Sequence, residues 1–129
     1  MRYFLKIEDC DANGTPVGKP LPVIAQGEFS GGVLSLEYIF DGAHYSMKIS
    51  DNRIFHNRYG DTEMKLEFIL NERTQGSLKS GGLNGNFDIF THELKITLTQ
   101  NGCNAHLEFS EGADDDEKII KNIVAYAVK

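Results

Sequence analysis

Two-residue turns divide this sequence into short segments in which apolar and polar residues alternate. Gly31-Gly32, Asp41-Gly42 and Asn101-Gly102 are pairs that two-residue β-hairpin turns favour, because such turns need positive φ angles. The residues that flank a turn of this kind pair one to one across it, so each turn predicts which side chains face each other. A correctly placed turn must bring apolar side chains together on one face.

All three turns meet this requirement. The apolar pairs that they predict are Phe29 with Leu34, Ala25 with Tyr38 and Val23 with Phe40; Tyr38 with Tyr45, Leu36 with Met47 and Leu34 with Ile49; and Leu94 with Phe109, Ile96 with Leu107 and Leu98 with Ala105. On the opposite face of the third hairpin, Lys95 meets Glu108 as a favourable charge pair. This agreement between turns and alternation predicts an antiparallel β-meander.

Further turns at Asn13-Gly14 and Asp51-Asn52 bring the expected number of strands to about eight to ten, by the same turn and alternation signals. The 129 residues fit one domain, residues 1–129. So many strands exceed what one flat sheet of this size holds, and we therefore predict an all-β fold, a single antiparallel barrel. Over residues 117–128 the apolar spacing favours a helix, whereas the Ile and Val content favours a strand.

Two parts of the chain carry a resemblance to a known family. An Arg-x-Gly step, Arg58-Tyr59-Gly60, follows the alternating segment AHYSMKISDNRIFHN, and the aromatic Phe87 precedes the alternating strand ELKITLT. The chain resembles the YwiB-like family of bacterial proteins of unknown function. The resemblance implies a small barrel of the calycin type, similar to a lipocalin, and no activity. It also implies a strand over 119–128 after a turn at Asp114 to Lys118.

The chain departs from the pattern of this family in two places. His92 stands where the family usually has Gly, and the stretch NERTQGSLKSGGLNG is longer than the usual link. Any role tied to that link is therefore not carried over to this chain.

Charge and hydropathy exclude several classes of partner. The net charge is −6 and no basic cluster occurs, which disfavours nucleic-acid binding. No apolar run reaches the length of a signal-peptide core or a membrane span, so we expect a cytoplasmic protein without a membrane partner. Cys10 and Cys103 are then expected to be free thiols. The oligomeric state does not follow from the sequence.

Three motifs suggest ligand sites but favour plainer interpretations. KSGGLNG lacks the Gly-Lys-Ser/Thr ending and the following helix of a phosphate loop, so we expect a strand connection. DCDANG matches the start of an EF-hand loop, but Pro20 stands where the bidentate Glu is needed, so we expect a hairpin turn. DDDEK is expected to be a solvated turn. We predict no metal site and no cofactor.

The segment IFHNRYG is the most informative for function. Pairing through the Asp51-Asn52 turn places His56 opposite Met47 and Arg58 opposite Tyr45, on the inward face. A three-residue loop after Arg58 keeps both side chains inside and sets His56 opposite Met64. A two-residue loop at Gly60-Asp61 turns them outward. The sequence does not choose between these loops.

If Arg58 points inward, it is a buried cation that must pair with or bind an anionic group. Tyr38 and Tyr45 would line the same wall, and we therefore take Arg58, His56, Tyr45 and Tyr38 as candidate ligand-binding residues. The outward alternative is a surface pair of Arg58 with Glu63, or an Arg58 bonded to loop carbonyls.

Three classes of function follow. The leading hypothesis is a non-enzymatic barrel that binds a small amphipathic or anionic ligand, which requires a cavity of about 300 Å³ or more. The alternative is a protein–protein interaction module with a solid core, with Pro20-Leu21-Pro22 and Ile123 to Val128 as candidate strand edges. An enzyme ranks third, and a strongly displaced pKa at His56 in a cleft would favour it.

Overall fold

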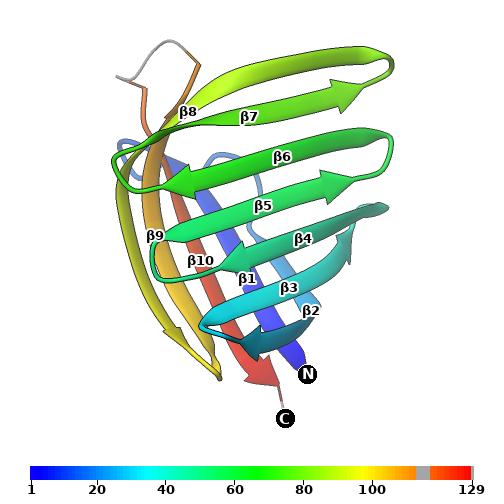
Figure 1. Cartoon of the computed structure of the whole chain (residues 1–129), viewed down its shortest axis with the longest axis vertical. Helices are drawn as coiled ribbons and strands as arrows, with labels where there is room; N and C mark the ends of the chain where they lie inside the picture. The colour runs from blue at the N-terminus through cyan, green and yellow to red at the C-terminus, as the bar shows by residue number, and fades with distance from the viewer. Residues whose placement is uncertain (113–116, 129) are drawn as a thin grey trace.

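The computed structural model describes residues 1–112 and 117–128 and shows an antiparallel barrel of ten strands (Figure 1). The strands are β1 (Arg2–Asp11), β2 (Leu21–Ser30), β3 (Val33–Phe40), β4 (Ala43–Ile49), β5 (Arg53–Tyr59), β6 (Thr62–Ile69), β7 (Arg73–Ser80), β8 (Leu83–Thr99), β9 (Gly102–Glu111) and β10 (Ile119–Val128). Every strand from β2 to β10 pairs with its neighbours in the chain, and β1 closes the barrel against β10. The all-β barrel prediction is confirmed.

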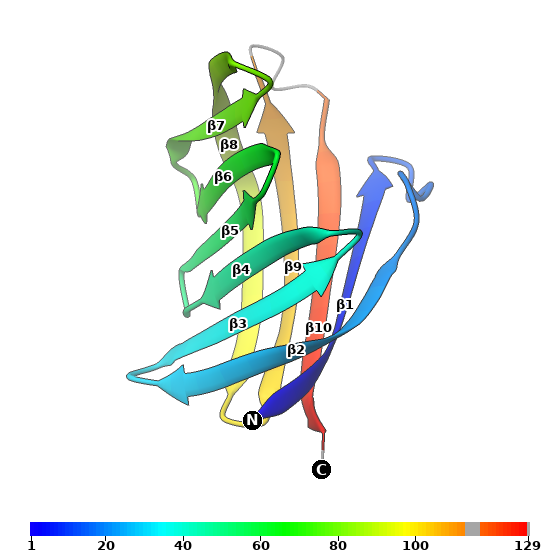
Figure 2. The ribbon, with the colours of Figure 1, turned by 90° about the vertical axis from the view of Figure 1, so that its right-hand side faces the viewer.

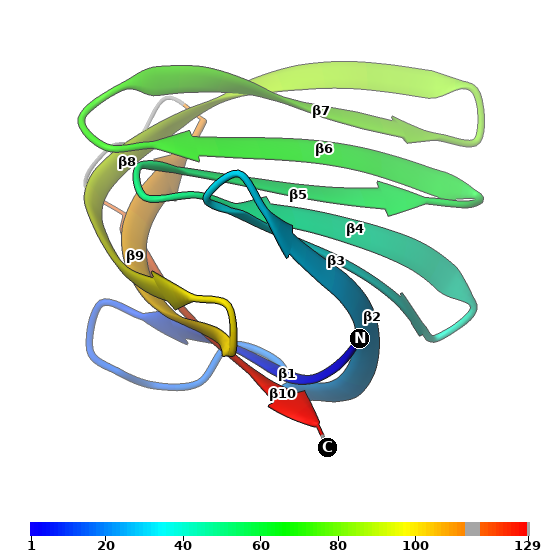
Figure 3. The ribbon, with the colours of Figure 1, turned by 60° about the horizontal axis from the view of Figure 1, so that its bottom comes forward.

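The strands do not all run in one direction. β8, β9, β10 and β1 run along the length of the molecule, whereas β3 to β7 cross them obliquely (Figure 2). Viewed towards one end, β1 and β10 lie on the opposite side of the ring from β6 and β7 (Figure 3). Side chains that point inward from the two groups of strands therefore meet in the middle of the barrel. No helix in the described part of the chain is long and apolar enough to cross a membrane.

The core follows the alternation in the sequence. Inward residues recur at every second position, for example Tyr3, Leu5 and Ile7 in β1. The largest fully buried hydrophobic side chains share this inward orientation and are Tyr3, Phe68, Leu5, Leu34, Leu36, Met47, Ile49, Ile54, Ile89, Leu107 and Ile123. The rings of Phe68 in β6 and Phe109 in β9 contact each other in the interior, with 4.8 Å between centroids. Apolar side chains thus fill most of the interior.

The Asp41-Gly42 and Asp51-Asn52 turns form with the predicted registers. Tyr38 pairs with Tyr45 across the first, and Met47 pairs with His56 across the second. Asp41 and Gly42 have φ angles of 51° and 76°, as a type I′ hairpin turn requires. These two turns fix the relative positions of β3, β4 and β5, which carry all four candidate ligand-binding residues.

The predicted register between β2 and β3 holds only near their turn. Phe29 pairs with Leu34, but the pairing ends at Gln26 and Glu37. Ala25 and Val23 pair instead with Tyr3 and Leu5 of β1, so their predicted pairing with Tyr38 and Phe40 is wrong. The pairing with β3 ends one residue before Gly27, where a Cβ would come within 2.7 Å of the Tyr3 ring and the Leu36 side chain. Glycine inside a strand often marks a bend or a close approach of this kind.

The third predicted hairpin is shifted by two residues. Leu94 pairs with Leu107 and Lys95 with His106, because the turn lies at Gln100-Asn101 rather than Asn101-Gly102. Gly102 already belongs to β9, where its backbone approaches β10 so closely that a Cβ would lie 2.0 Å from the Ala125 carbonyl oxygen. A shift of two residues keeps every side chain on its predicted face but changes its partner.

The remaining motifs are turns and strands. Gly81-Gly82 joins β7 to β8 as a tight hairpin, so KSGGLNG is a strand connection as predicted. At DCDANG the Asp11 Oδ1 accepts hydrogen bonds from the backbone N–H groups of Asn13 and Thr15, which confirms a turn. The C-terminal segment is the strand β10, so the helical alternative is wrong. Asp114 to Asp116 lie outside the described residues, and the turn predicted there is not tested.

The Gly81-Gly82 turn allows a direct stability test. Gly82 has φ of 83°, so Gly82→Ala should cost about 1 kcal/mol of unfolding free energy through backbone strain. Gly85, two positions into β8, is open on its Cβ side and is not among the positive-φ glycines, so Gly85→Ala should cost nothing. Urea unfolding of both variants checks this, and equal losses of stability would contradict the turn assignment.

Candidate functional site

The four candidate residues lie together on the inward faces of β3, β4 and β5. Tyr38 of β3 pairs with Tyr45 of β4, which in turn pairs with Arg58 of β5, and His56 follows two positions away on the same face. Tyr38 and His56 are buried, whereas Tyr45 and Arg58 are partly exposed. The group therefore extends from solvent at the end of these strands into the barrel interior.

The alternatives for the loop after Arg58 are resolved in favour of the inward orientation. Arg58 pairs with Met64 and His56 with Leu66 across β5 and β6. The inward side-chain orientation predicted for a three-residue loop is therefore correct. The strand register predicted for that loop, with His56 opposite Met64, is wrong by two residues. The surface pair of Arg58 with Glu63 is wrong.

Direct contacts join these side chains into one cluster, which we call the polar end: Tyr38, Tyr45, His56 and Arg58. The hydroxyl of Tyr38 lies 2.7 Å from Nε2 of His56. The rings of Tyr38 and Tyr45 stack in parallel, with 4.9 Å between centroids and 1° between planes. The Arg58 guanidinium lies 5.8 Å from the centroid of the Tyr45 ring, within the range of a cation–π contact.

Burial controls the protonation of this cluster. Desolvation, aided by the positive charge of Lys121, lowers the pKa of His56 from 6.5 to about 3, so the imidazole is neutral at physiological pH. Burial also raises the pKa of Tyr38 above its ordinary value, with smaller contributions from Tyr45 and Asp9. Tyr38 therefore keeps its hydroxyl proton as a hydrogen-bond donor.

Two polar atoms of the polar end have no hydrogen-bond partner within the described residues. These are Nδ1 of His56 and Nε of Arg58, and both are shielded from solvent. If the Tyr38 hydroxyl donates to Nε2 of His56, the proton of the imidazole resides on Nδ1 and only this N–H is left without an acceptor. The opposite tautomer would leave both the Tyr38 proton and Nδ1 unsatisfied. We therefore assign the Nδ1–H tautomer.

A set of charged residues faces the polar end from the other strands, and sequence reasoning missed it. Lys121 of β10 is buried and lies 3.0 Å from the Asp9 carboxylate of β1, which is its direct cross-strand partner. Burial raises the pKa of Glu111, in β9, while Lys121 opposes this shift. Predicting this pair from sequence would have required the register of β1 against β10, which places Asp9 opposite Lys121. That register follows only once β10 is identified as a strand that pairs with β1.

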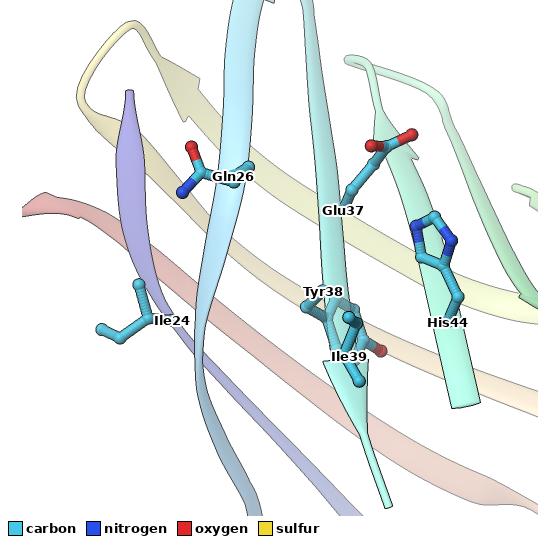
Figure 4. A pocket seen from close by; sticks show the side chains of 6 residues that line it. All are labelled: Ile24, Gln26, Glu37, Tyr38, Ile39 and His44. Carbon is cyan, nitrogen blue, oxygen red and sulfur yellow. The ribbon is translucent and has the colours of Figure 1, made fainter. Parts of the chain in front are cut away.

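A surface hollow of about 340 Å³ lies beside the polar end, where β2 and β3 diverge. Its lining side chains come from β2, β3 and β4 and are Ile24, Gln26, Glu37, Tyr38, Ile39 and His44 (Figure 4). Most of these lining side chains belong to the outer face of the barrel. Tyr38 is the candidate residue among them. The hollow thus touches the polar end at Tyr38, whereas Tyr45, His56 and Arg58 do not line it.

Residues 23–122 match the model of a family described as Domain of unknown function (DUF1934). The chain belongs to this family. The match spans most of the barrel, from β2 to the start of β10, and therefore includes the whole polar end. A comparison with curated protein sequences found no match.

The structure is similar to the crystal structure of the ywiB protein from Bacillus subtilis. The TM-score is 0.76 with 13% sequence identity, over 99% of this chain and 91% of the other. The predicted resemblance to the YwiB-like family is confirmed, and the fold is consistent with a calycin-like barrel.

His92, where the family usually has Gly, lies at a β-bulge between Thr91 and Glu93. A bulge is a position that glycine often occupies in a strand.

Proposed function

We propose that this DUF1934 barrel is a non-enzymatic module that binds a small amphipathic anion at its polar end. The observation that carries the proposal is the pair of shielded, unpartnered donors, His56 Nδ1–H and Arg58 Nε–H. A buried donor without an acceptor costs about 1–3 kcal/mol, so a ligand acceptor at this position would recover that free energy.

The charges around the polar end favour an anion of low charge. Arg58 and Lys121 supply two positive charges, and Asp9 offsets one of them through its ion pair with Lys121. Burial favours the neutral form of Glu111. One carboxylate, sulfonate or phosphate monoanion would balance the remaining charge of Arg58, which is suited to planar, bidentate recognition of such groups.

The aromatic residues favour a ligand with an apolar or planar part. Tyr38 and Tyr45 present a flat stacked pair beside the guanidinium, and Tyr45 is partly exposed. A ligand could place its ring against Tyr45 and its anionic group against Arg58. Most of the deeper interior is filled by Leu, Ile and Phe side chains, which restricts the ligand to the end of the barrel and to the adjoining hollow.

The test uses the fluorescent amphipathic anion 8-anilino-1-naphthalenesulfonate as the probe. Arg58→Met should weaken its binding about 10- to 100-fold, because one charge-assisted hydrogen bond is lost. Arg53→Met is the matched control: Arg53 lies on the same strand, is exposed and also contacts an aromatic ring, that of Phe55. Equal affinities of the two variants would contradict the proposal.

A second candidate function is an interaction with another protein through the hollow between β2 and β3. Ile24 and Ile39 are 52% and 73% exposed there, beside backbone segments whose β2–β3 pairing has ended. The segment Ile123 to Val128, considered as an edge from sequence, pairs with β1 along its length and with β9 as far as Tyr126, so it is not an edge strand. Cross-linking at Ile39→Cys would test this surface directly.

One feature of His56 supports the enzyme alternative and two count against it. The pKa of His56 is strongly displaced, as that alternative requires, but a value of about 3 makes the imidazole a weak base at neutral pH. Its Nε2 is also engaged by Tyr38.

The cytoplasm is the compartment that we propose for this protein, since Cys10 and Cys103 are both free thiols.

A further inference from the structure

A second cluster lies on the outer face of the barrel, away from the polar end. Glu93 of β8 is the direct cross-strand partner of Glu108 of β9, and His106 lies two positions before Glu108 on the same face. The carboxylate oxygens of Glu93 and Glu108 and a ring nitrogen of His106 lie within 4.8 Å of one another. All three side chains are partly buried and remain accessible to solvent.

The imidazole of His106 is held in a defined orientation. Its Nδ1 lies 2.7 Å from Oδ1 of Asn122, which is its cross-strand partner in β10. Because an amide oxygen only accepts hydrogen bonds, Nδ1 carries the proton in the neutral ring. The lone pair is then on Nε2, which faces the Glu108 carboxylate at 3.8 Å. A hydrogen bond to the far ring nitrogen is the typical support of a metal-binding histidine.

The electrostatics of the cluster favour a cation between the carboxylates. Two glutamates directly opposite each other on neighbouring strands repel, which destabilises the pair. Lys95, the cross-strand partner of His106, relieves part of this repulsion, with its Nζ 2.7 Å from the Glu93 carboxylate. The Lys95 side chain is 75% exposed and can move into solvent. The space between the two glutamates is therefore already attractive to a positive charge.

We propose that Glu93, His106 and Glu108 bind a divalent transition-metal ion, with zinc as the ion best matched to one imidazole and two carboxylates. Zinc binds such ligands at about 2.0–2.2 Å, so small side-chain rotations would bring the three donor atoms onto one ion. Three protein ligands leave a fourth position for water or for an external ligand. Nothing in this arrangement involves the polar end, so the two proposals stand independently.

The experiment is an isothermal titration of the metal-free full-length protein with zinc chloride. The expected result is one ion per chain, with at least a tenfold loss of affinity in His106→Ala and in Glu108→Gln. His44→Ala and Cys10→Ser are the matched controls, since His44 is another exposed histidine and Cys10 is a partly exposed thiol. If His44→Ala or Cys10→Ser lowers the affinity as much as His106→Ala, the proposal is overturned.

Two further variants separate a built site from casual binding by a surface histidine. Asn122→Leu should weaken zinc binding about 10- to 100-fold through loss of the ring support, whereas Asn122→Asp should preserve it. Lys95→Met should tighten binding, because it removes a competing charge beside Glu93. Far-ultraviolet circular dichroism of each metal-free variant verifies folding. Unchanged affinity in Asn122→Leu together with Lys95→Met would overturn the assignment.

Discussion

Acidification from about pH 7.5 to about pH 4.5 is expected to destabilise the wild-type protein by roughly 3 kcal/mol more than a His56→Gln variant. The pKa of His56 falls from 6.5 to about 3 on folding, so the unfolded chain binds a proton in this range and the folded chain does not. The contribution of His56 is fully present above pH 6.5 and is lost as the pH falls from 6.5 towards 3.

The groups that face His56 explain why the folded protein resists its protonation. Tyr38 engages Nε2 from β3, and Tyr45 packs beside the ring from β4. Arg58 lies two positions away on the same strand, and the Lys121 ammonium acts on the imidazole from β10. The surroundings thus combine burial with positive charge, and both disfavour an imidazolium ion.

The measurement is the unfolding free energy from urea titrations at several pH values for the wild type and two variants. His56→Gln retains an amide that can accept the Tyr38 hydroxyl, so it isolates the titration from a gross loss of packing. His44→Gln, at an exposed histidine, should follow the wild-type pH profile. Parallel profiles for His56→Gln and the wild type would show that His56 is not held neutral.

Gly102→Ala is expected to cost about 2–4 kcal/mol of unfolding free energy, which is a large effect for a single methyl group. Two causes add at this position. Gly102 has φ of 146°, a conformation that other residues rarely adopt, and its Cβ would lie 2.0 Å from the Ala125 carbonyl oxygen. The close approach of β9 to β10 cannot persist with a side chain there.

The control for this substitution is Gly32→Ala. Gly32 has φ of 77° but open space on its Cβ side, so only the backbone strain of about 1 kcal/mol applies. Urea unfolding of the two variants separates the clash from the strain. Equal losses of stability would mean that Gly102 does not approach β10 as closely as described. Gly102 and His106 lie in the same β9–β10 ladder, which pairs His106 with Asn122, so Gly102→Ala should also weaken zinc binding.

Turn chemistry predicted the strand positions better than it predicted the register. Asp41-Gly42 gave correct partners because both of its residues take positive φ angles in the turn. Asn101-Gly102 has the same turn signal, but there glycine serves the packing of β9 against β10 instead. The turn role of glycine and its packing role differ only in whether a neighbouring strand lies against the residue. A local sequence pattern does not show that contact between β9 and β10.

The candidate site was predicted in part for the same reason. Short-range pairing across the turns at Asp41-Gly42 and Asp51-Asn52 predicted that Tyr38, Tyr45, His56 and Arg58 share one face, but the loop after Arg58 left the orientation of Arg58 and His56 open. The charged residues opposite them, Asp9 and Lys121, are 112 positions apart and meet only because β1 and β10 close the barrel. The Glu93–Glu108 pair was missed because the third hairpin is shifted by two residues.

The most direct test of anion binding at the polar end is a long-range ¹H–¹⁵N correlation spectrum of the histidine and arginine side chains, recorded with and without 8-anilino-1-naphthalenesulfonate. We expect a neutral His56 protonated at Nδ1 in the free protein. We further expect the ligand to shift the resonances of His56 Nδ1 and Arg58 Nε while those of His44 and Arg53 stay in place. Ligand binding that leaves His56 and Arg58 unshifted would contradict anion binding at the polar end.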